Sequence, residues 1–576
     1  MLDILIRDAT LVDGTGAAPR RADVGVKDGL IVEVGSVSTP AARVVDAGGR
    51  LVTPGFVDIH THYDGQASWD PFLAPTSLNG VTSIAMGNCG VGFAPAKPDR
   101  HDWLIALLEG VEDIPGTALA EGLTWDWESF PDYLDALGRR QYAMDVAAHL
   151  PHAALRTYVM GERGANHLEH PDAGEIAEMA RLTEQALAAG ALGFSTSRTF
   201  VHKSRSGENI GTLEAGRAEL LGIADAMRRS GKGVIQLISD AYLTADDAFA
   251  ERELDLIAEM ARAGGRPLSF TVQQTDEAPD RFHHIFDRIG GMVGQGLDVK
   301  AQVACRPIGA VQGLEATLNP FLFCPEWRRI GHLPLAAKLE ELAKPDVRAT
   351  LLAQHAAIRP EGFGELIAHG FSRMFRVSDP VDYEPTADRS VAAEAAARGV
   401  NPPELMLDLL AEEAGHRLLY MPLINYARGN LDDVHKMMTA PHTLFGLSDG
   451  GAHCGTICDA SFPTSTLAIW ARGNKAESRI PLETLVHGLT QRNAAHVGWH
   501  DRGRVAPGLR ADLNLIDLDE LAVPPPQMVR DLPAGGGRLL QRPRGIEMTV
   551  CAGTVTFEQG EATGALPGRL LRGAKG

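Results

Sequence analysis

The sequence has no long hydrophobic run, few cysteines and a deficit of basic residues. No stretch of 18 apolar residues occurs, so no segment is expected to span a membrane. Six cysteines in 576 residues are too few for a disulfide framework, and the pair in "CGTIC" has no second pair to complete a structural zinc site. The chain has 54 Lys and Arg against 74 Asp and Glu. A net charge of −20 argues against nucleic acid or an anionic membrane surface as a partner.

The first residues, "MLDILIRDATLVDG", also lack the basic start and apolar core of a signal peptide. Together with the expectation of reduced thiols, this predicts a cytoplasmic protein. Hydrophobic residues make up 44% and charged residues 22%, which are ordinary values for a globular protein. The length is sufficient for one large core and a smaller second domain.

Short strands separated by turns dominate both ends of the chain. Residues 1–54 contain segments such as "ADVGVKDGLIVEVG", in which Asp-Gly and Gly-Gly breaks interrupt alternating apolar residues. The same pattern of short alternating runs broken by turn residues returns after residue 503, for example in "IEMTVCAGTVTFEQGE". We therefore expect residues 1–54 and 504–576 to pair into one small composite β domain.

The middle of the chain, residues 55–503, alternates amphipathic helices, glycine stops and apolar strands. "EAGRAELLGIADAMRRSGKGVIQLISDA" is one such unit. Eight candidate strands can be counted, at 55–61, 81–87, 144–150, 192–197, 233–239, 267–273, 299–305 and 443–448. Eight units predict an α/β fold, a (β/α)8 TIM-like barrel with its chemistry at the C-terminal strand ends. Residues from about 310 to 442, with helical patterns such as 402–415, are expected to form a long insertion within the barrel domain.

Two histidines end the first predicted barrel strand, in "GFVDIHTHYD". His60 and His62 should point to the same side, because side chains alternate along an extended chain. Such a pair indicates either a metal site or two polar residues at a strand end. Asp449 directly follows the eighth strand, which neighbours the first in a closed barrel; alternatively it is a helix N-cap or turn residue. Together the three side chains form a plausible metal site with an open position for water.

Several segments along most of the chain resemble the amidohydrolase superfamily, and within it the N-acyl-D-amino-acid deacylase (D-aminoacylase) group. They are "PGFVDIHTHYD", "TSIAMGNCGVGFAPA", "GALGFSTS", "LSDGGAH" and "GRVAPGLRADLNLIDL". The resemblance implies a barrel with one or two metal ions and a β-sandwich built from both termini. It also implies that Cys89 of the "GNCG" turn is a metal ligand, the alternative being a small buried hydrophobic residue.

The sequence departs from this group at two ligand positions. The group uses one histidine after strand five and one after strand six, but "GVIQLISDAY" and "RPLSFTVQQTD" contain none. Ile238 or Ser239 and residues 271–273 stand there instead, and they cannot replace imidazoles on zinc. We therefore predict a single ion, Zn²⁺ or alternatively Mn, Co or Fe. Its predicted ligands are His60, His62, Cys89 and Asp449, and a second site would have to use His149, His152 or His202.

A basic loop follows the fourth strand, in "SRTFVHKSRSGE". In so acidic a chain, Arg198, His202 and Lys203 predict an anion-binding loop that holds a substrate carboxylate. A solvated run of charges is the alternative. His453, four residues after Asp449, is a further candidate to donate a hydrogen bond to the substrate, or to support a metal ligand.

These residues predict hydrolysis of a carbon–nitrogen bond. A metal-activated water would attack, and Asp449 would accept its proton and pass it to the leaving nitrogen. The leading hypothesis is a metal-dependent hydrolase that cleaves the amide bond of N-acyl amino acids or related carboxylated amides. Two alternatives stay open: an amidohydrolase acting on a cyclic or other non-acylamino amide, and a metal-poor barrel that serves as a binding or scaffold protein. The expected partner is a small-molecule amide, and a homo-oligomer is compatible with the sequence.

Overall fold

Eight parallel strands form the central sheet of the computed structural model, which describes residues 1–473 and 478–573. Their order across the sheet is β6-β7-β8-β9-β10-β11-β12-β16, and an isolated bridge between Thr61 and Gly450 joins its two edges. The strands are β6 (Phe56–Thr61), β7 (Val81–Met86), β8 (Asp145–Pro151), β9 (Gly193–Arg198), β10 (Val234–Ser239), β11 (Leu268–Thr271), β12 (Val299–Val303) and β16 (Thr443–Phe445). All eight predicted strands are therefore confirmed, in the order of a TIM-like barrel.

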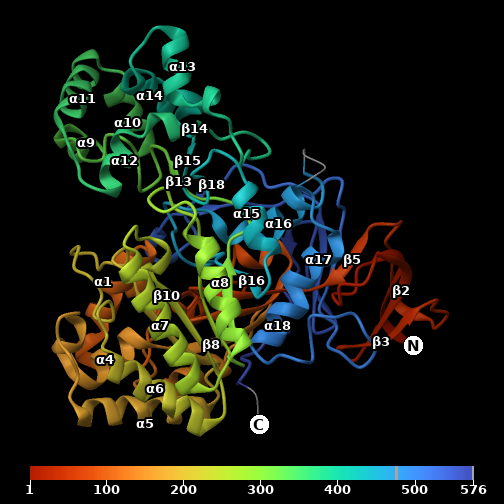
Figure 1. Cartoon of the computed structure of the whole chain (residues 1–576). Coiled ribbons are helices and arrows are strands. Elements are labelled where there is room, and N and C mark those ends of the chain that lie inside the picture. Colours follow the sequence, from red (N-terminus) through yellow and green to blue (C-terminus); the bar gives the residue numbers. More distant parts are fainter. Residues whose placement is uncertain (474–477, 574–576) are drawn as a thin grey trace.

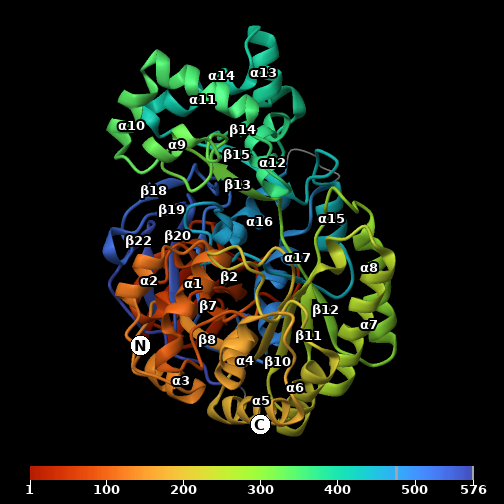
Figure 2. The same ribbon diagram turned by 90° about the vertical axis from the view of Figure 1, so that its left-hand side faces the viewer.

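Helices cover the outside of this sheet (Figures 1 and 2). The helix α5 shows why they form: Asp172 and Glu175 make a reciprocal capping box at its start, and Gly190 ends it in the left-handed conformation with φ 109°. The helices of this part of the chain are α1 (His101–Glu112), α2 (Gly116–Gly122), α3 (Phe130–Gly138), α4 (His152–Met160), α5 (Ala173–Ala189), α6 (Arg217–Ser230), α7 (Asp247–Gly264) and α8 (Arg281–Gly294). Later in the chain come α15 (Asp432–Thr439), near the end of the predicted insertion, and then α16 (Phe462–Trp470), α17 (Leu482–His487) and α18 (Asn493–His496).

Both ends of the chain contribute to one nine-stranded sheet, beside the barrel in Figure 1. The link between the two ends is antiparallel pairing of β5 with β17, from Leu51↔Ile516 to Pro54↔Leu513. The strands are β1 (Leu2–Leu11), β2 (Arg20–Lys27), β3 (Leu30–Gly35), β4 (Ala41–Asp46), β5 (Leu51–Pro54), β17 (Leu513–Ile516), β20 (Ile546–Cys551), β21 (Thr554–Glu558) and β22 (Glu561–Ala562). Two small strands, β18 (Gln527–Val529) and β19 (Arg538–Leu540), pair separately. The ends thus meet, while the predicted two-layered sandwich stays a prediction.

A helical segment with its own core lies between β12 and β16, at one end of the molecule in both views (Figures 1 and 2). It combines helices with a three-stranded antiparallel sheet. The elements are β13 (Ile308–Gln312), α9 (Pro325–Ile330), α10 (Leu335–Leu342), α11 (Pro345–Ala357), α12 (Phe363–His369), β14 (Phe375–Arg376), α13 (Val391–Arg398), α14 (Pro402–Ala411) and β15 (Leu419–Ile424). Prolines in the first turns of α9, α11 and α14 suit these starts, where a backbone N–H has no helical partner. Across the described ranges, no helix combines the length and apolarity needed to cross a bilayer.

Candidate active site

Two histidines and a cysteine converge where the first two barrel strands end. His60 Nε2 lies 3.2 Å from Cys89 Sγ, and one ligand atom each from His60, His62 and Cys89 lie within 4.8 Å of one another. All three residues are buried, with exposed fractions of 1%, 2% and 5%. Cys89 has φ 55°, and its backbone N–H donates to Gln236 Oε1 at 2.9 Å, which holds the turn in place. Imidazole nitrogens and a thiol at this spacing suit a metal ion of the zinc class.

Asp449 joins this cluster because the eighth strand runs beside the first. Its Oδ1 lies 3.3 Å from His60 Nε2 and 3.6 Å from His62 Nε2. The His62 backbone N–H donates to the Gly450 carbonyl at 2.7 Å, and the Ser448 hydroxyl donates to Asp58 in β6. The backbone at position 450 also lies close to Thr76, and only glycine fits there, because a Cβ would lie 2.1 Å from Thr76 Oγ1. The juxtaposition expected from a closed barrel is therefore present.

The other ring nitrogens of the two histidines face acceptors that motif reasoning missed. His60 Nδ1 lies 2.6 Å from Gln302 Oε1, and His62 Nδ1 lies 3.2 Å from Glu112 Oε1. Gln302 belongs to β12, and Glu112 is the last residue of α1, with 2% of its surface exposed. A polar residue inside the strand "VKAQVA" and an acid within the apolar run "IALLEGVE" were the only local signals for them.

The electrostatics of the site keep Asp449 ionised. Burial alone would raise the pKa of Asp449, but interactions with the neighbouring histidines, first of all a hydrogen bond from His62, outweigh burial and hold the pKa below its ordinary value. Burial lowers the pKa of His60 to about 4, so its ring is neutral at pH 7. Burial raises the pKa of the Cys89 thiol to about 12, whereas a bound cation would stabilise its thiolate. Neutral imidazole, carboxylate and thiolate are the forms that bind metal ions.

The basic loop after the fourth strand does not have the predicted arrangement. Arg198 donates from Nε and Nη2 to the Glu253 carboxylate at 2.8 and 2.7 Å, and from Nη1 to the Ala215 carbonyl at 2.7 Å. Its guanidinium is thus engaged inside the protein, an arrangement that does not support the prediction that Arg198 holds a substrate carboxylate. Lys203 is exposed and its backbone bridges to Asn209.

Two further predicted histidines lie at the edge of the cluster. His202 Nδ1 is 2.9 Å from Ser197 Oγ, and burial together with the nearby His62 lowers its pKa to about 3. His453 Nε2 lies 3.9 Å from Asp449 Oδ2 and 4.0 Å from Glu112 Oε2. His453 therefore lies beside Asp449, and His202 is close enough for Asp449 and His62 to influence its pKa.

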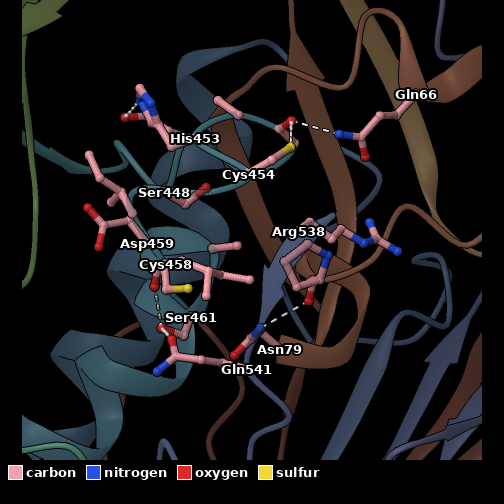
Figure 3. A pocket seen from close by; sticks show the side chains of 17 residues that line it. Gln66, Asn79, Ser448, His453, Cys454, Cys458, Asp459, Ser461, Arg538 and Gln541 are labelled. Atoms are coloured by element: carbon pink, nitrogen blue, oxygen red, sulfur yellow. Dashed lines mark hydrogen bonds and ion pairs between the residues drawn. The ribbon is translucent and has the colours of Figure 1, made fainter. Parts of the chain in front are cut away.

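A cavity adjoins Asp449 on the side of the loop after β16 (Figure 3). His453, Cys454, Cys458 and Asp459 line one side of it in this view, and Gln66, Asn79 and Arg538 lie opposite. None of His60, His62 and Cys89 is among its lining residues. The cavity therefore borders Asp449 but not the other three candidate ligands.

The structure describes no second group of ligands at strands five and six. Ile238 is partly buried, and Thr271 and Gln273 are buried polar residues. His152 bonds to Thr196 Oγ1 at 2.8 Å and to Glu219 Oε1 at 3.0 Å, away from the cluster. His149 is buried, and its Nδ1 has no hydrogen-bond partner among the described residues. Within residues 1–473 and 478–573, the set of His60, His62 and Cys89 is the one three-ligand group that meets the spacing of a metal site.

Comparison with known proteins places this geometry in a family. The family described as "Amidohydrolase family" matches residues 43–557. An N-acyl-D-aspartate deacylase of Alcaligenes xylosoxydans xylosoxydans is 27% identical over 578 residues, covering 99% of this chain and 95% of the relative. A D-aminoacylase crystal structure superposes with a TM-score of 0.65 at 23% identity, covering 99% and 100% of the two chains. An N-acyl-D-glutamate deacylase of Bordetella bronchiseptica, complexed with zinc and a phosphonate inhibitor, gives 0.64 at 23% identity, covering 99% of each chain. The chain belongs to the amidohydrolase family, hydrolytic enzymes that act on carbon–nitrogen bonds.

Proposed function

We propose that the protein is a metal-dependent hydrolase that cleaves the amide bond of N-acyl amino acids. The observation that carries this proposal is the convergence of His60, His62 and Cys89 on one point, with the Asp449 carboxylate 3.3 Å from His60 Nε2. The family supports hydrolysis of a carbon–nitrogen bond, and the relatives named as deacylases of N-acyl-D-aspartate and N-acyl-D-glutamate support an acylated amino acid as substrate.

The residues present fit one metal ion. His60, His62 and Cys89 would hold it, with Asp449 as the fourth ligand, and nitrogen and sulfur donors favour Zn²⁺ while Mn, Co and Fe accept overlapping ligand types. A bound ion of this class lowers the pKa of water and polarises a carbonyl. We propose one ion per chain, because Ile238, Thr271 and Gln273 offer no imidazole at the positions where a second would be held.

The chain's own residues supply the proton transfer and the substrate contacts. Asp449, ionised and next to the ligand cluster, would accept a proton from the attacking water and deliver it to the leaving nitrogen. His453 and His202 would donate hydrogen bonds to the substrate. Lys203, exposed on the loop after β9, would attract the substrate carboxylate.

We also propose the following domain organisation. Residues 55–503 form the catalytic barrel domain, interrupted by the insertion at about 310–442, and residues 1–54 with 504–576 form a composite β-sandwich. Pairing of β5 with β17 supports the composite domain, and the separate core of α9 to α14 supports the insertion.

The test is hydrolysis by purified protein of known metal content. The panel contains the D and L forms of N-acetyl-aspartate, N-acetyl-glutamate and N-acetyl-leucine, together with a hydantoin as a cyclic amide. Release of free amino acid, abolished by a chelator and restored by Zn²⁺, is the expected result. Ring opening of the hydantoin with no deacylation would indicate the cyclic-amide alternative. Absence of both turnover and bound metal would indicate a scaffold protein.

A further inference from the structure

Each of the two candidate histidine ligands meets an acceptor on the ring nitrogen that faces away from Cys89. For His60 the acceptor is the Gln302 amide oxygen, 2.6 Å from Nδ1. For His62 it is the Glu112 carboxylate, 3.2 Å from Nδ1. A neutral imidazole has one N–H and one lone pair, so an acceptor at Nδ1 places the proton there and leaves the Nε2 lone pair for a metal.

We propose that Glu112 and Gln302 are positioning residues that fix the tautomer and the ring orientation of His62 and His60 for metal binding. This inference rests on the proposed metal site and adds to it two residues outside the ligand set. Histidines that bind metals commonly donate their second ring N–H to a carboxylate or carbonyl, and such partners typically change metal affinity by 10- to 100-fold.

The Gln302 amide is itself held in one orientation. Its Nε2 donates to Ser269 Oγ at 2.9 Å, which turns Oε1 toward His60. Ser269 is in β11 and Gln302 in β12, so adjacent strands of the barrel fix the direction of this chain of hydrogen bonds. A flipped amide would present N–H to His60 Nδ1 and would force the proton onto Nε2, the atom that must bind the metal.

Glu112 is held by the loop that also carries Asp449. The backbone N–H of His453 donates to the Glu112 carbonyl, and the Cys454 N–H donates to the Asp113 carbonyl at 3.2 Å. Asp113 Oδ2 accepts the Gly455 N–H at 2.9 Å. Among the described residues, neither His62 Nδ1 nor Glu112 Oε1 is hydrogen-bonded to any other group, and the two atoms face each other at 3.2 Å. The end of α1 is therefore anchored where its last carboxylate reaches His62.

The experiment measures the zinc dissociation constant by chelator competition for wild type, Glu112→Met and Gln302→Met. Each methionine keeps the side-chain length and removes the acceptor, so a 10- to 100-fold weaker affinity is expected. Glu112→Gln and Gln302→Glu retain an acceptor oxygen and should recover most of the affinity, and Ser269→Ala should give a smaller loss than Gln302→Met. Glu109→Met is the matched control, because Glu109 is on the same helix but pairs with Arg205 at 3.1 Å.

A spectroscopic measurement separates positioning from general damage to the fold. In the Co²⁺-loaded protein, the methionine variants should shift the ligand-field bands relative to wild type, while Glu109→Met leaves them unchanged. Wild-type zinc affinity and spectra in both methionine variants would overturn the inference. Because neither measurement uses a substrate, a wild type that binds zinc yet cleaves no N-acyl amino acid would reject the proposed substrate and leave this inference standing. A wild type that binds no zinc would reject both.

Discussion

Replacing Asp449 with asparagine separates proton transfer from the shape of the site. In the wild type, Asp449 Oδ1 lies 3.3 Å from His60 Nε2 and 3.6 Å from His62 Nε2. The asparagine amide keeps an oxygen that can face these two nitrogens, but it cannot accept a proton at neutral pH. The wild-type carboxylate is ionised, because its neighbouring histidines hold its pKa below the ordinary value in spite of burial. Loss of a positioned general base costs about 10²- to 10⁴-fold in kcat, equivalent to about 2.7–5.4 kcal/mol.

The assay compares kcat for the best N-acyl amino acid in wild type and Asp449→Asn, with zinc content and Tm measured on the same samples. We expect the fall in kcat to exceed any fall in zinc content at saturating metal. Asp432→Asn, which changes an exposed aspartate at the start of α15, serves as the control and should match wild type. Turnover within about threefold of wild type in a zinc-loaded Asp449→Asn protein would refute the assignment of Asp449 as the base.

Three further predictions concern the metal, the substrate loop and a buried charge cluster. Elemental analysis should find about one transition ion per chain, with His60→Ala and His62→Ala losing it and Cys89→Ser binding it more weakly; two tightly held ions would contradict the single site. The substrate preference is the ratio of kcat/KM for an N-acyl amino acid to kcat/KM for its methyl ester. Lys203→Ala should reduce this ratio by at most about fivefold, the scale of an exposed ion pair. Arg198→Ala should lower Tm and leave the ratio unchanged. Glu219 is buried between His152 Nε2 at 3.0 Å and Arg156 Nη1 at 3.2 Å. Burial opposes its ionisation, but these partners outweigh burial and hold the pKa of Glu219 below its ordinary 4.5. The ionised Glu219 therefore stabilises the folded state fully above about pH 4.5, and this contribution is lost as the pH falls. Glu219→Gln should lower the free energy of unfolding by about 3–5 kcal/mol at pH 7 and by less at pH 4. Equal losses at both pH values in urea denaturation would contradict this sign.

Local patterns in the sequence were sufficient to predict the elements that build the barrel. Apolar runs, several of them preceded by glycine, identified all eight strands, because burial on both faces leaves a continuous apolar signature that needs no knowledge of the partner strand. The two-residue spacing of His60 and His62 predicted a shared direction, because side-chain alternation is a property of a single strand. Strand count then predicted that Asp449 would lie beside them, since the first and eighth strands of a barrel are neighbours.

The partners of these side chains were decided only by the tertiary structure. Glu112 and Gln302 reach the two histidines from positions 50 and 242 residues away in the chain, and no local period connects them. Arg198 illustrates the same limit: its sequence neighbours suggested a free basic loop, but the bidentate partner Glu253 lies 55 residues further on. Charge pairing depends on which groups the fold brings within a few ångströms and removes from water. Hydrophobic periodicity is set by each segment's own geometry, so the strands could be predicted, whereas the hydrogen bonds and ion pairs that orient the site depended on how the segments packed.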